Sequence, residues 1–242
     1  MKPPKLLVDA DYFLYRAAAA AELELEYNPD LTVIVGDFME GRRIVKQEWR
    51  NLRQRFETDD LLLCFTDTTN FRKDIDPTYK SNRRKTRKPL GYAAMKDWVR
   101  HNYASIMKPG LEGDDCLSIL STRPGNECIM VSDDKDMLGC PGQLFRPSTD
   151  ELHEISVEDA DRFFLTQVLT GDPTDGYKGL PGVGPKKAEA ILGPRPHWGA
   201  VEQAYIKAGH TKEDALVQAR LARILRWSDW DPEKGVPILW KP

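Results

Sequence analysis

The sequence predicts an α/β protein with a mostly parallel central sheet flanked by helices, followed by a helical C-terminal third. Short apolar, strand-like stretches alternate with helical patterns up to about residue 155, and only helical patterns and glycine-rich turns follow. Acidic residues also recur directly after strand-like stretches, as expected where parallel strand ends converge on a ligand-binding edge. At 242 residues the chain can bury one large core, or one core with a small appended domain.

Each expected element follows from a local pattern. Residues 5–10 are apolar and β-prone and predict the first strand, and the alanine-rich stretch 13–26 predicts a helix. Apolar residues at helical spacing predict a helix over 37–57. The continuous apolar run at 60–67 predicts a strand that is buried on both faces. Two further helices and two further strands are expected over 91–103, 113–120, 127–133 and 143–147.

The chain changes character at Ser156. This serine has the chemistry of a helix N-cap, and acidic residues follow it in the first turn of an expected helix. A glycine-rich turn at 179–184 leads into a short helix, and another helix is expected over 211–226. We therefore expect an α/β part over 1–155, including a basic segment at 71–88, and a helical region over 156–242.

Bulk properties exclude several classes of protein. The formal net charge is −3 and the pI is near 5.9, so the overall charge does not indicate a nucleic-acid binder. The N-terminal apolar run is too short for a signal peptide, and no stretch reaches the length of a membrane span. The four cysteines lack CxxC pairs and zinc-like spacing with histidines, and Cys64 and Cys128 lie in strand-like runs. These features predict buried thiols and a soluble, cytoplasmic protein without membrane contact.

The acidic residues form short clusters at the ends of the expected strands and at the starts of helices. So many negative charges cannot share a small space without cations, which favours a site for two divalent metal ions. Hard oxygen ligands suit Mg²⁺, with Mn²⁺ able to substitute. An isolated aspartate after a strand is as often a turn or cap residue. The candidate ligands are Asp9, Asp67, Glu112, Asp114, Asp115, Asp134, Asp136, Asp172 and Asp175.

Positive charge is concentrated in one segment. Residues 72–88 hold eight Lys or Arg against two Asp, a local excess of six positive charges. Such a stretch is most often a solvated face or a flexible loop. Beside an acidic metal site, it is better explained as a clamp for a polyanion. Phe71 and Tyr79 lie among these charges, and aromatic rings next to cations are typical of sites that hold unpaired bases.

The turn GLPGVG at 179–184 lies between expected helices and precedes Lys186 and Lys187. Its glycines permit positive φ angles, and the next helix start offers free N–H groups to a phosphate. A glycine-rich turn is often only a connection; here the lysines favour a helix-hairpin-helix that binds the DNA backbone independently of sequence. Four tryptophans nearby are expected to pack in the core: Trp198, Trp227, Trp230 and Trp240.

Five ordered strings resemble the flap endonuclease and 5′-exonuclease family. They are LLVDADYFLYRA, CFTDTTNFRKDIDPTYKSNRR, LEGDDC, VSDDKDM and GDPTDGYKGLPGVGPKKAEAIL, and they span most of the chain. The final ARILRW and PILWKP resemble in particular the short stand-alone 5′→3′ exonucleases of podovirus-type phages. The resemblance implies a PIN-like 5′-nuclease fold and hydrolysis of phosphodiesters at 5′ ends or flaps of duplex DNA. A role in phage DNA metabolism would follow, such as primer removal or degradation of host DNA.

The resemblance also implies roles for the acidic positions. Asp9, Asp67, Glu112 and Asp114 match the ligands of a first metal ion. Asp134, Asp136, Asp172 and Asp175 match the residues around a second, with Asp114 near both ions and Asp115 acting through water. Two Mg²⁺ ions, about 3.5–4 Å apart in typical sites, would activate a water molecule and stabilise the leaving 3′-oxygen. Products would carry a 5′-phosphate.

The same resemblance implies the contacts with DNA. Lys80 and Arg83 match the residues of a basic arch that reach the scissile phosphate, with Tyr79 beside them. Arg72 and Arg16 are expected to contact DNA nearby. The duplex would be held by Gly182, Val183, Gly184, Lys186 and Lys187, in a hairpin where the family can also bind K⁺.

Two other function classes have weaker support. A non-catalytic helix-hairpin-helix DNA-binding protein would lack several of the carboxylates, and none is missing. A phosphatase for small esters would match the string VDAD, as in haloacid-dehalogenase-type enzymes, but would not need the basic segment. Ala10 and Asp133 depart from the family, which often has a glycine and a neutral residue there. No polymerase domain or evident sliding-clamp peptide is present, and cleavage of an RNA strand in RNA–DNA hybrids stays open.

Overall fold

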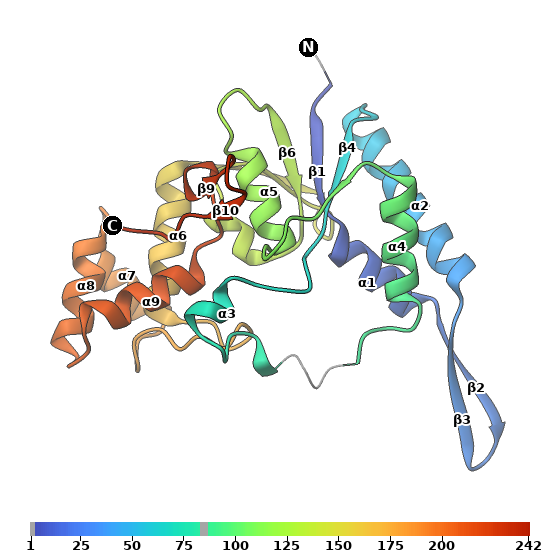
Figure 1. Ribbon diagram of the computed structural model, residues 1–242, viewed down its shortest axis with the longest axis horizontal. Coiled ribbons are helices and arrows are strands. Elements are labelled where there is room, and N and C mark those ends of the chain that lie inside the picture. Colours follow the sequence, from blue (N-terminus) through green and yellow to red (C-terminus); the bar gives the residue numbers. More distant parts are fainter. Residues whose placement is uncertain (1–2, 83–86) are drawn as a thin grey trace.

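The computed structural model describes residues 3–82 and 87–242, with a six-stranded sheet at the centre (Figure 1). The strands lie in the order β5-β4-β1-β6-β7-β8, and only the pair β7–β8 among them is antiparallel. They span Lys5–Asp9 (β1), Leu61–Cys64 (β4), Ser105–Ile106 (β5), Cys128–Val131 (β6), Gly142–Arg146 (β7) and Glu151–Ile155 (β8). The predicted mostly parallel sheet is confirmed, and β8 is an edge strand that the sequence pattern did not indicate.

Strand β1 is central because it pairs on both sides with apolar strands. Leu7 lies in register with Leu62 of β4 and Met130 of β6. Side chains alternate between the two faces of a strand, so Leu6 and Val8 pack into one core and Leu7 into another. A strand covered on both faces presents no side to water, which explains its continuous apolar sequence.

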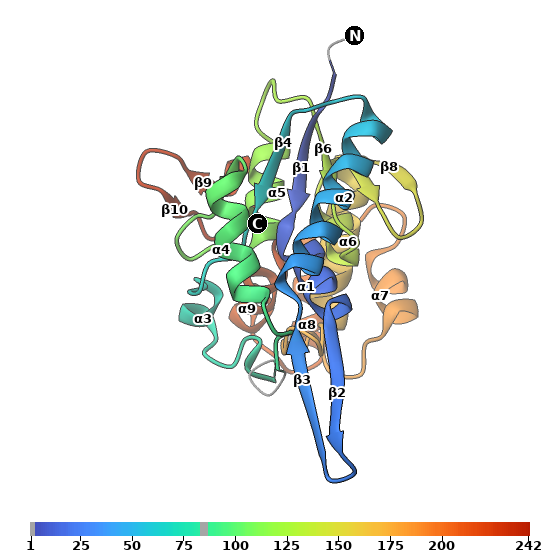
Figure 2. The same cartoon turned by 90° about the vertical axis from the view of Figure 1, so that its right-hand side faces the viewer.

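Helices cover both faces of the sheet. The face of Leu6 and Val8 is covered by α1 (Ala10–Ala20), α2 (Phe38–Phe56) and α4 (Tyr92–Asn102), which lie in front of the sheet in Figure 2. The opposite face is covered by α5 (Gly113–Ser121), by the start of α6 (Val157–Thr170) and by residues from the C-terminal tail. The predicted helices over 37–57, 91–103 and 113–120 are therefore confirmed.

The stretch 13–26, predicted as one helix, is instead the end of α1 followed by a strand. Glu22–Asn28 (β2) pairs antiparallel with Leu31–Gly36 (β3) in a ribbon that projects from the body (Figures 1 and 2). The prediction is wrong because the alternation ELELE has a period of two, which favours a strand. Asn28 then closes a turn by accepting a hydrogen bond from the Asp30 N–H.

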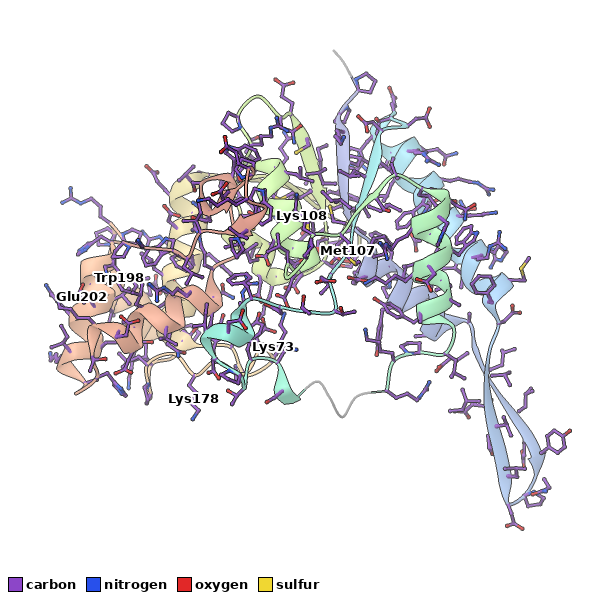
Figure 3. All side chains as sticks on the ribbon, viewed as in Figure 1. Lys73, Met107, Lys108, Lys178, Trp198 and Glu202 are labelled. Atoms are coloured by element: carbon purple, nitrogen blue, oxygen red, sulfur yellow. The ribbon has the colours of Figure 1, made fainter. Side chains whose placement is uncertain are left out.

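The C-terminal third is helical, as predicted, and has its own apolar core. Besides α6 it contains α7 (Pro185–Leu192), α8 (Trp198–Lys207), α9 (Lys212–Ala222), the 3-10 helix η3 (Trp227–Asp229) and the short strands β9 (Trp230–Asp231) and β10 (Val236–Pro237). Helix α8 and the last two strands were not predicted. Trp198 on α8, labelled in Figure 3, meets Trp240 edge to face with ring centroids 4.9 Å apart. Trp227 and Trp230 pack in the core beside the sheet, so the tryptophans serve packing as expected.

Two short helices complete the description: α3 (Arg72–Ile75) at the start of the basic segment and η2 (Lys135–Gly139) after β6. The four cysteines are free, and all except the partly exposed Cys128 are buried. Within residues 3–82 and 87–242, no helix combines the length and apolar character required to cross a membrane.

Candidate active site

The carboxyl ends of β1 and β6 and the start of α5 bring acidic side chains to one edge of the sheet. Asp9 ends β1, caps α1 and accepts a hydrogen bond from the Ser132 hydroxyl at 3.0 Å. Asp134 follows β6 and caps η2 by accepting from the Asp136 N–H at 2.8 Å. Asp114 lies in the first turn of α5, where the helix dipole favours negative charge. The acidic edge predicted from the sequence is therefore present.

Two adjoining cavities are lined by these carboxylates. The larger has a volume of about 310 Å³ and includes Asp9 in its wall, and the narrower includes Asp136 and Asp175. Four side chains line both cavities and so join them: Lys80, Glu112, Asp114 and Asp134. The structure thus gathers six of the nine predicted ligands, namely Asp9, Glu112, Asp114, Asp134, Asp136 and Asp175. The other three, Asp67, Asp115 and Asp172, line neither cavity.

Burial and crowding disfavour the charged form of several of these carboxyls. Burial, and then the charges of Asp11 and Asp134, raise the pKa of Asp9 to about 7. Burial likewise raises the pKa of Asp114 well above its ordinary range, with repulsion from Asp9 and Asp134 adding to it. The pKa of Asp136 rises to about 7 for the same two reasons. A set of carboxylates that repel one another is stabilised when a cation enters among them.

Protein cations neutralise part of this negative charge. Lys80 Nζ lies 2.6 Å from Glu112 Oε1 and 3.3 Å from Asp175 Oδ2. Lys135 Nζ lies 3.1 Å from Asp172 Oδ2 and helps to lower the pKa of that carboxyl, along with the hydrogen bonds from Thr174. Among the described residues, no three acidic side chains converge as a finished metal-binding set. The oxygen donors nevertheless fit hard divalent cations in type, charge and crowding.

Asp67 contributes to a loop and not to the cavities. Its carboxylate accepts hydrogen bonds from the Thr69 hydroxyl at 2.6 Å and the Gly110 N–H at 2.8 Å. These bonds lower the pKa of Asp67 to about 2. The two bonds hold the carboxylate between its own loop and the loop of Gly110, outside both cavities, and its role as a first-metal ligand stays a prediction.

Asp115 and Arg72 form a buried ion pair, which leaves Arg72 no surface for DNA, while the action of Asp115 through water stays a prediction. Asp115 is fully buried, and both of its oxygens receive guanidinium N–H groups of Arg72 at 2.8 Å. Arg72 is only 2% exposed and so cannot meet DNA. The sequence shows that these residues are charged, but not that they neutralise each other inside the protein.

Tyr79 is also buried, so it is not available to stack on a base. Its ring is 2% exposed and packs in the C-terminal core. Its hydroxyl donates to Asp175 Oδ2 at 3.0 Å and lies 3.3 Å from Glu112 Oε2. The predicted stacking role is therefore wrong for this conformation, and Tyr79 instead supports two carboxylates of the narrower cavity.

The glycine-rich turn lies on the surface before α7. Gly182 has a φ of +76°, Gly184 caps α7 and Val183 is half-buried. Lys186 and Lys187 are exposed, and Lys187 Nζ donates to the Gly182 carbonyl at 2.8 Å. The turn belongs to a longer connection that begins after Thr170 and also carries Asp172 and Asp175. Duplex and K⁺ binding at this turn stay predictions.

Asp133 lines the larger cavity, and Arg16 is joined to it through Tyr12, which lines the same cavity. Exposed Arg16 donates to the Tyr12 hydroxyl at 2.9 Å, and Tyr12 in turn donates to Asp133. Hydrogen bonds from Tyr12 and Ser148 lower the pKa of Asp133, although its burial opposes them. Asp133, which departs from the family pattern, is therefore held in place by Tyr12 and Ser148. The predicted contact of Arg83 with the phosphate falls outside the described residues.

Asp11 is a further acidic residue of the larger cavity, and it was not among the candidate ligands predicted from the sequence. It lines the larger cavity and accepts hydrogen bonds from the Thr66 N–H, the Tyr92 hydroxyl and Lys96 Nζ at 2.7, 2.5 and 3.2 Å. These bonds fasten α1 to the end of β4 and to α4 beside Asp9. Only its two-residue spacing from Asp9 marks it in the sequence.

A family model described as the N-terminal resolvase-like domain of 5′-3′ exonucleases matches residues 4–162. The chain belongs to the 5′-3′ exonuclease family. It is 29% identical to the exonuclease of Escherichia phage T7, in an alignment covering 98% of this chain and 93% of that protein. It is 27% identical to the exodeoxyribonuclease of Enterobacteria phage T3, covering 98% and 92%.

A solved phage nuclease structure shares the fold of this chain. The bacteriophage T5 D15 flap endonuclease, in a pseudo-enzyme-product complex with DNA and metal ions, gives a TM-score of 0.66 at 15% identity. The alignment covers 91% of this chain and 89% of that chain. The family resemblance and the 5′-nuclease-like fold predicted from the sequence are both confirmed.

Proposed function

We propose that the protein is a divalent-metal-dependent nuclease that hydrolyses phosphodiesters at the 5′ ends and 5′ flaps of duplex DNA. The observation that carries this proposal is the pair of joined acidic cavities with Lys80 in the wall of both. Carboxylates alone would repel a phosphate, and a lysine alone would bind it without reaction. Together they suit a site in which cations and a protein ammonium act on one phosphodiester.

Six carboxylates would hold the metal ions: Asp9, Glu112, Asp114, Asp134, Asp136 and Asp175. Bound Mg²⁺ or Mn²⁺ would supply a water of lowered pKa and charge stabilisation for the leaving oxygen. Asp114 lines both cavities and carries a raised pKa, so it is the side chain best placed to act on both sides of the site. The relatives of known structure with bound metal ions support this part of the proposal.

Lys80 would bind the scissile phosphate. Its positive φ of 54° turns the chain so that the backbone N–H donates to the Asp175 carbonyl at 2.8 Å. The ammonium thereby reaches across the opening between the two cavities. On substrate binding, Lys80 would exchange its contact with Glu112 for a phosphoryl oxygen, which orients the phosphodiester over the carboxylates.

The duplex beyond the cut would rest on the turn at 179–184, where Pro181, Gly182 and Gly184 are exposed, with Lys186 and Lys187 next to its phosphates. Helix N-termini bind phosphate because their first N–H groups are unpaired, and α7 begins at this turn. Such contacts carry no base information, so cleavage should depend on the structure of the DNA and not on its sequence. The same geometry would also accept an RNA strand in an RNA–DNA hybrid.

The test is cleavage of a 5′-labelled duplex and a 5′-flap substrate in Mg²⁺ and in EDTA. We expect short products that appear only with the metal ion. Asp134→Asn should reduce cleavage at least 100-fold while duplex binding survives, because it weakens a ligand that faces both cavities. Asp97→Asn, at an exposed position on α4, is the matched control and should cleave normally. Turnover retained in Asp134→Asn would reject its metal-ligand role, and hydrolysis of a chromogenic phosphate ester alone would favour a phosphatase.

A further inference from the structure

Arg72 is a buried charged side chain beside the cavities, and its guanidinium donates four hydrogen bonds. Its Nη1 and Nη2 atoms each donate to an oxygen of Asp115 at 2.8 Å. Nε donates to the Leu221 carbonyl at 3.1 Å, and Nη2 also donates to the Arg223 carbonyl at 2.5 Å. The guanidinium additionally packs on the Phe71 ring at 4.6 Å from the centroid. Such a network has only one geometry, because the five N–H groups of arginine form a rigid fork.

The network is connected to the acidic cavities through Glu112, which lines both of them. Asp115 Oδ2 accepts from the Glu112 N–H at 3.1 Å, and Arg72 Nη1 lies 3.7 Å from Glu112 Oε2. Asn70 also donates to Glu112 Oε1 at 2.9 Å. The other faces of this carboxylate meet Lys80 and Tyr79. Arg72, which also lines the narrower cavity, therefore supports the side chain of Glu112 directly and its backbone through Asp115.

The network also brings the C-terminal segment into the wall of the site. Leu221, Ala222 and Ile224 line the narrower cavity together with the carboxylates. Asp115 Oδ1 accepts from the Leu225 N–H at 3.0 Å, so the segment 221–225 is fastened at both ends to the Arg72–Asp115 pair. These hydrogen bonds all involve Arg72 or Asp115, so loss of the pair would remove them and leave the segment without this polar link to α5.

We infer that Arg72 is a positioning residue of the nuclease: it aligns Glu112 for the reaction and closes the narrower cavity with residues 221–225. The inference rests on the proposed function, since it assigns Arg72 a part in that reaction. Arg72 is not a DNA contact in this role, because it is buried. It does more than fill the core, because its hydrogen-bond network ends on Glu112, a carboxylate of the site. Lysine cannot replace the arginine, since one ammonium cannot donate to Asp115 in two parallel bonds and also reach two carbonyls.

The test compares Arg72→Lys with Arg226→Lys. Arg226 is the control for the general effect of replacing a buried arginine by lysine. It is buried and donates to Gly139 and Asp161, but it lines neither acidic cavity. We expect Arg72→Lys to lower kcat about 10- to 100-fold, with little change in KM or duplex affinity, because small displacements of reacting groups cost this much. Arg226→Lys should keep near-normal kcat. All assays are run below the unfolding temperature of each variant.

A double-mutant cycle shows whether the loss passes through Glu112. In a Glu112→Gln background, Arg72→Lys should cause less than about a 2-fold further loss, because coupled residues are not additive. An undiminished 10- to 100-fold loss in that background would overturn the inference. If Arg72→Lys instead bound duplex DNA more weakly and with a smaller salt dependence, the inference would be overturned and Arg72 would be a DNA contact.

Hydrogen exchange supplies a readout that does not need cleavage. Arg72→Lys, and Asp115→Asn if the first variant folds poorly, should speed exchange of the Glu112 and Leu225 amides at least 10-fold. Unchanged protection of both amides would overturn the inference even if the wild type were inactive. Absence of cleavage by the wild type, with the expected exchange behaviour, would instead count against the proposed function alone.

Discussion

Neutralising one carboxyl of the acidic edge should stabilise the metal-free protein, although it removes a residue of the site. Asp9 is the clearest case, because burial, followed by the charges of Asp11 and Asp134, raises its pKa to about 7. In the unfolded chain the same carboxyl returns to an ordinary value near 3.8. Asp9→Asn keeps the size of the side chain and removes the charge. The native state then no longer has to hold that charge beside its neighbours.

The magnitude follows from the shift in pKa. A rise from 3.8 to about 7 corresponds to about 4 kcal/mol, since one pKa unit is about 1.4 kcal/mol. We take about half, roughly 2 kcal/mol, because Asp9 faces a cavity that solvent can enter. The folded carboxyl binds a proton more tightly than the unfolded one, so the stability of the wild type falls as pH rises from about 4 to about 7. For a chain of this length, 2 kcal/mol corresponds to a change in Tm of about 4–8 °C.

Thermal unfolding followed by circular dichroism in EDTA, at pH 8 and at pH 4.5, measures this effect. Asp9→Asn should raise Tm at pH 8, and most of the gain should vanish at pH 4.5. Asp67→Asn is the control of opposite sign, because hydrogen bonds lower the pKa of Asp67 to about 2 and its charge is therefore stabilising at pH 8. The reasoning fails if Asp9→Asn is neutral or destabilising at pH 8, or if both variants shift Tm in the same direction.

Three further predictions concern the turn, the connection before α7 and the buried tyrosine. Replacing Lys186 and Lys187 with Ala should weaken duplex binding equally across sequences and reduce the salt slope by about 2; unchanged values in binding titrations would exclude this grip. Gly179→Ala should cost at least about 3 kcal/mol in urea unfolding, because its Cβ would lie 2.2 Å from a backbone nitrogen. Gly209→Ala, with φ +84° but open space around it, should cost only about 1–2 kcal/mol, and equal losses would contradict the steric argument. Tyr79→Leu, which removes the aromatic ring, should leave duplex affinity intact because the ring is buried, and weaker binding in that variant would restore the stacking role.

The parts of the fold set by local patterns were predictable from the sequence. Helix α2 carries a long apolar stripe, and β4 is a short apolar run, so each pattern allows one element only. The prediction for 13–26 failed because the helix preference of its alanines was extended over the residues after Ala21, where the period-two alternation favours a strand. The sheet itself followed from the alternation of strands and helices.

The positions of the acidic residues of the site were predictable from the sequence, but the ion pairs that these residues form were not. The sequence placed Asp9, Asp114 and Asp134 at one edge correctly, because strand ends and helix starts determine their position. It could not show that Arg72 belongs to Asp115, because that depends on how the basic segment folds back onto α5. A basic residue in a basic segment is naturally read as facing DNA; only its burial shows otherwise.

The Arg72 network also has a consequence for how the protein is made. The carbonyls that Arg72 binds lie at Leu221 and Arg223, 149 and 151 positions further along the chain. At ordinary rates of synthesis those residues leave the ribosome roughly 8–30 s after Arg72 does. During that interval the growing chain already carries Asp9, and then its acidic neighbours, without the wall that closes the cavity. The wall of the narrower cavity is therefore complete only once residues 221–225 have been made, and a copy that stops before them lacks that wall.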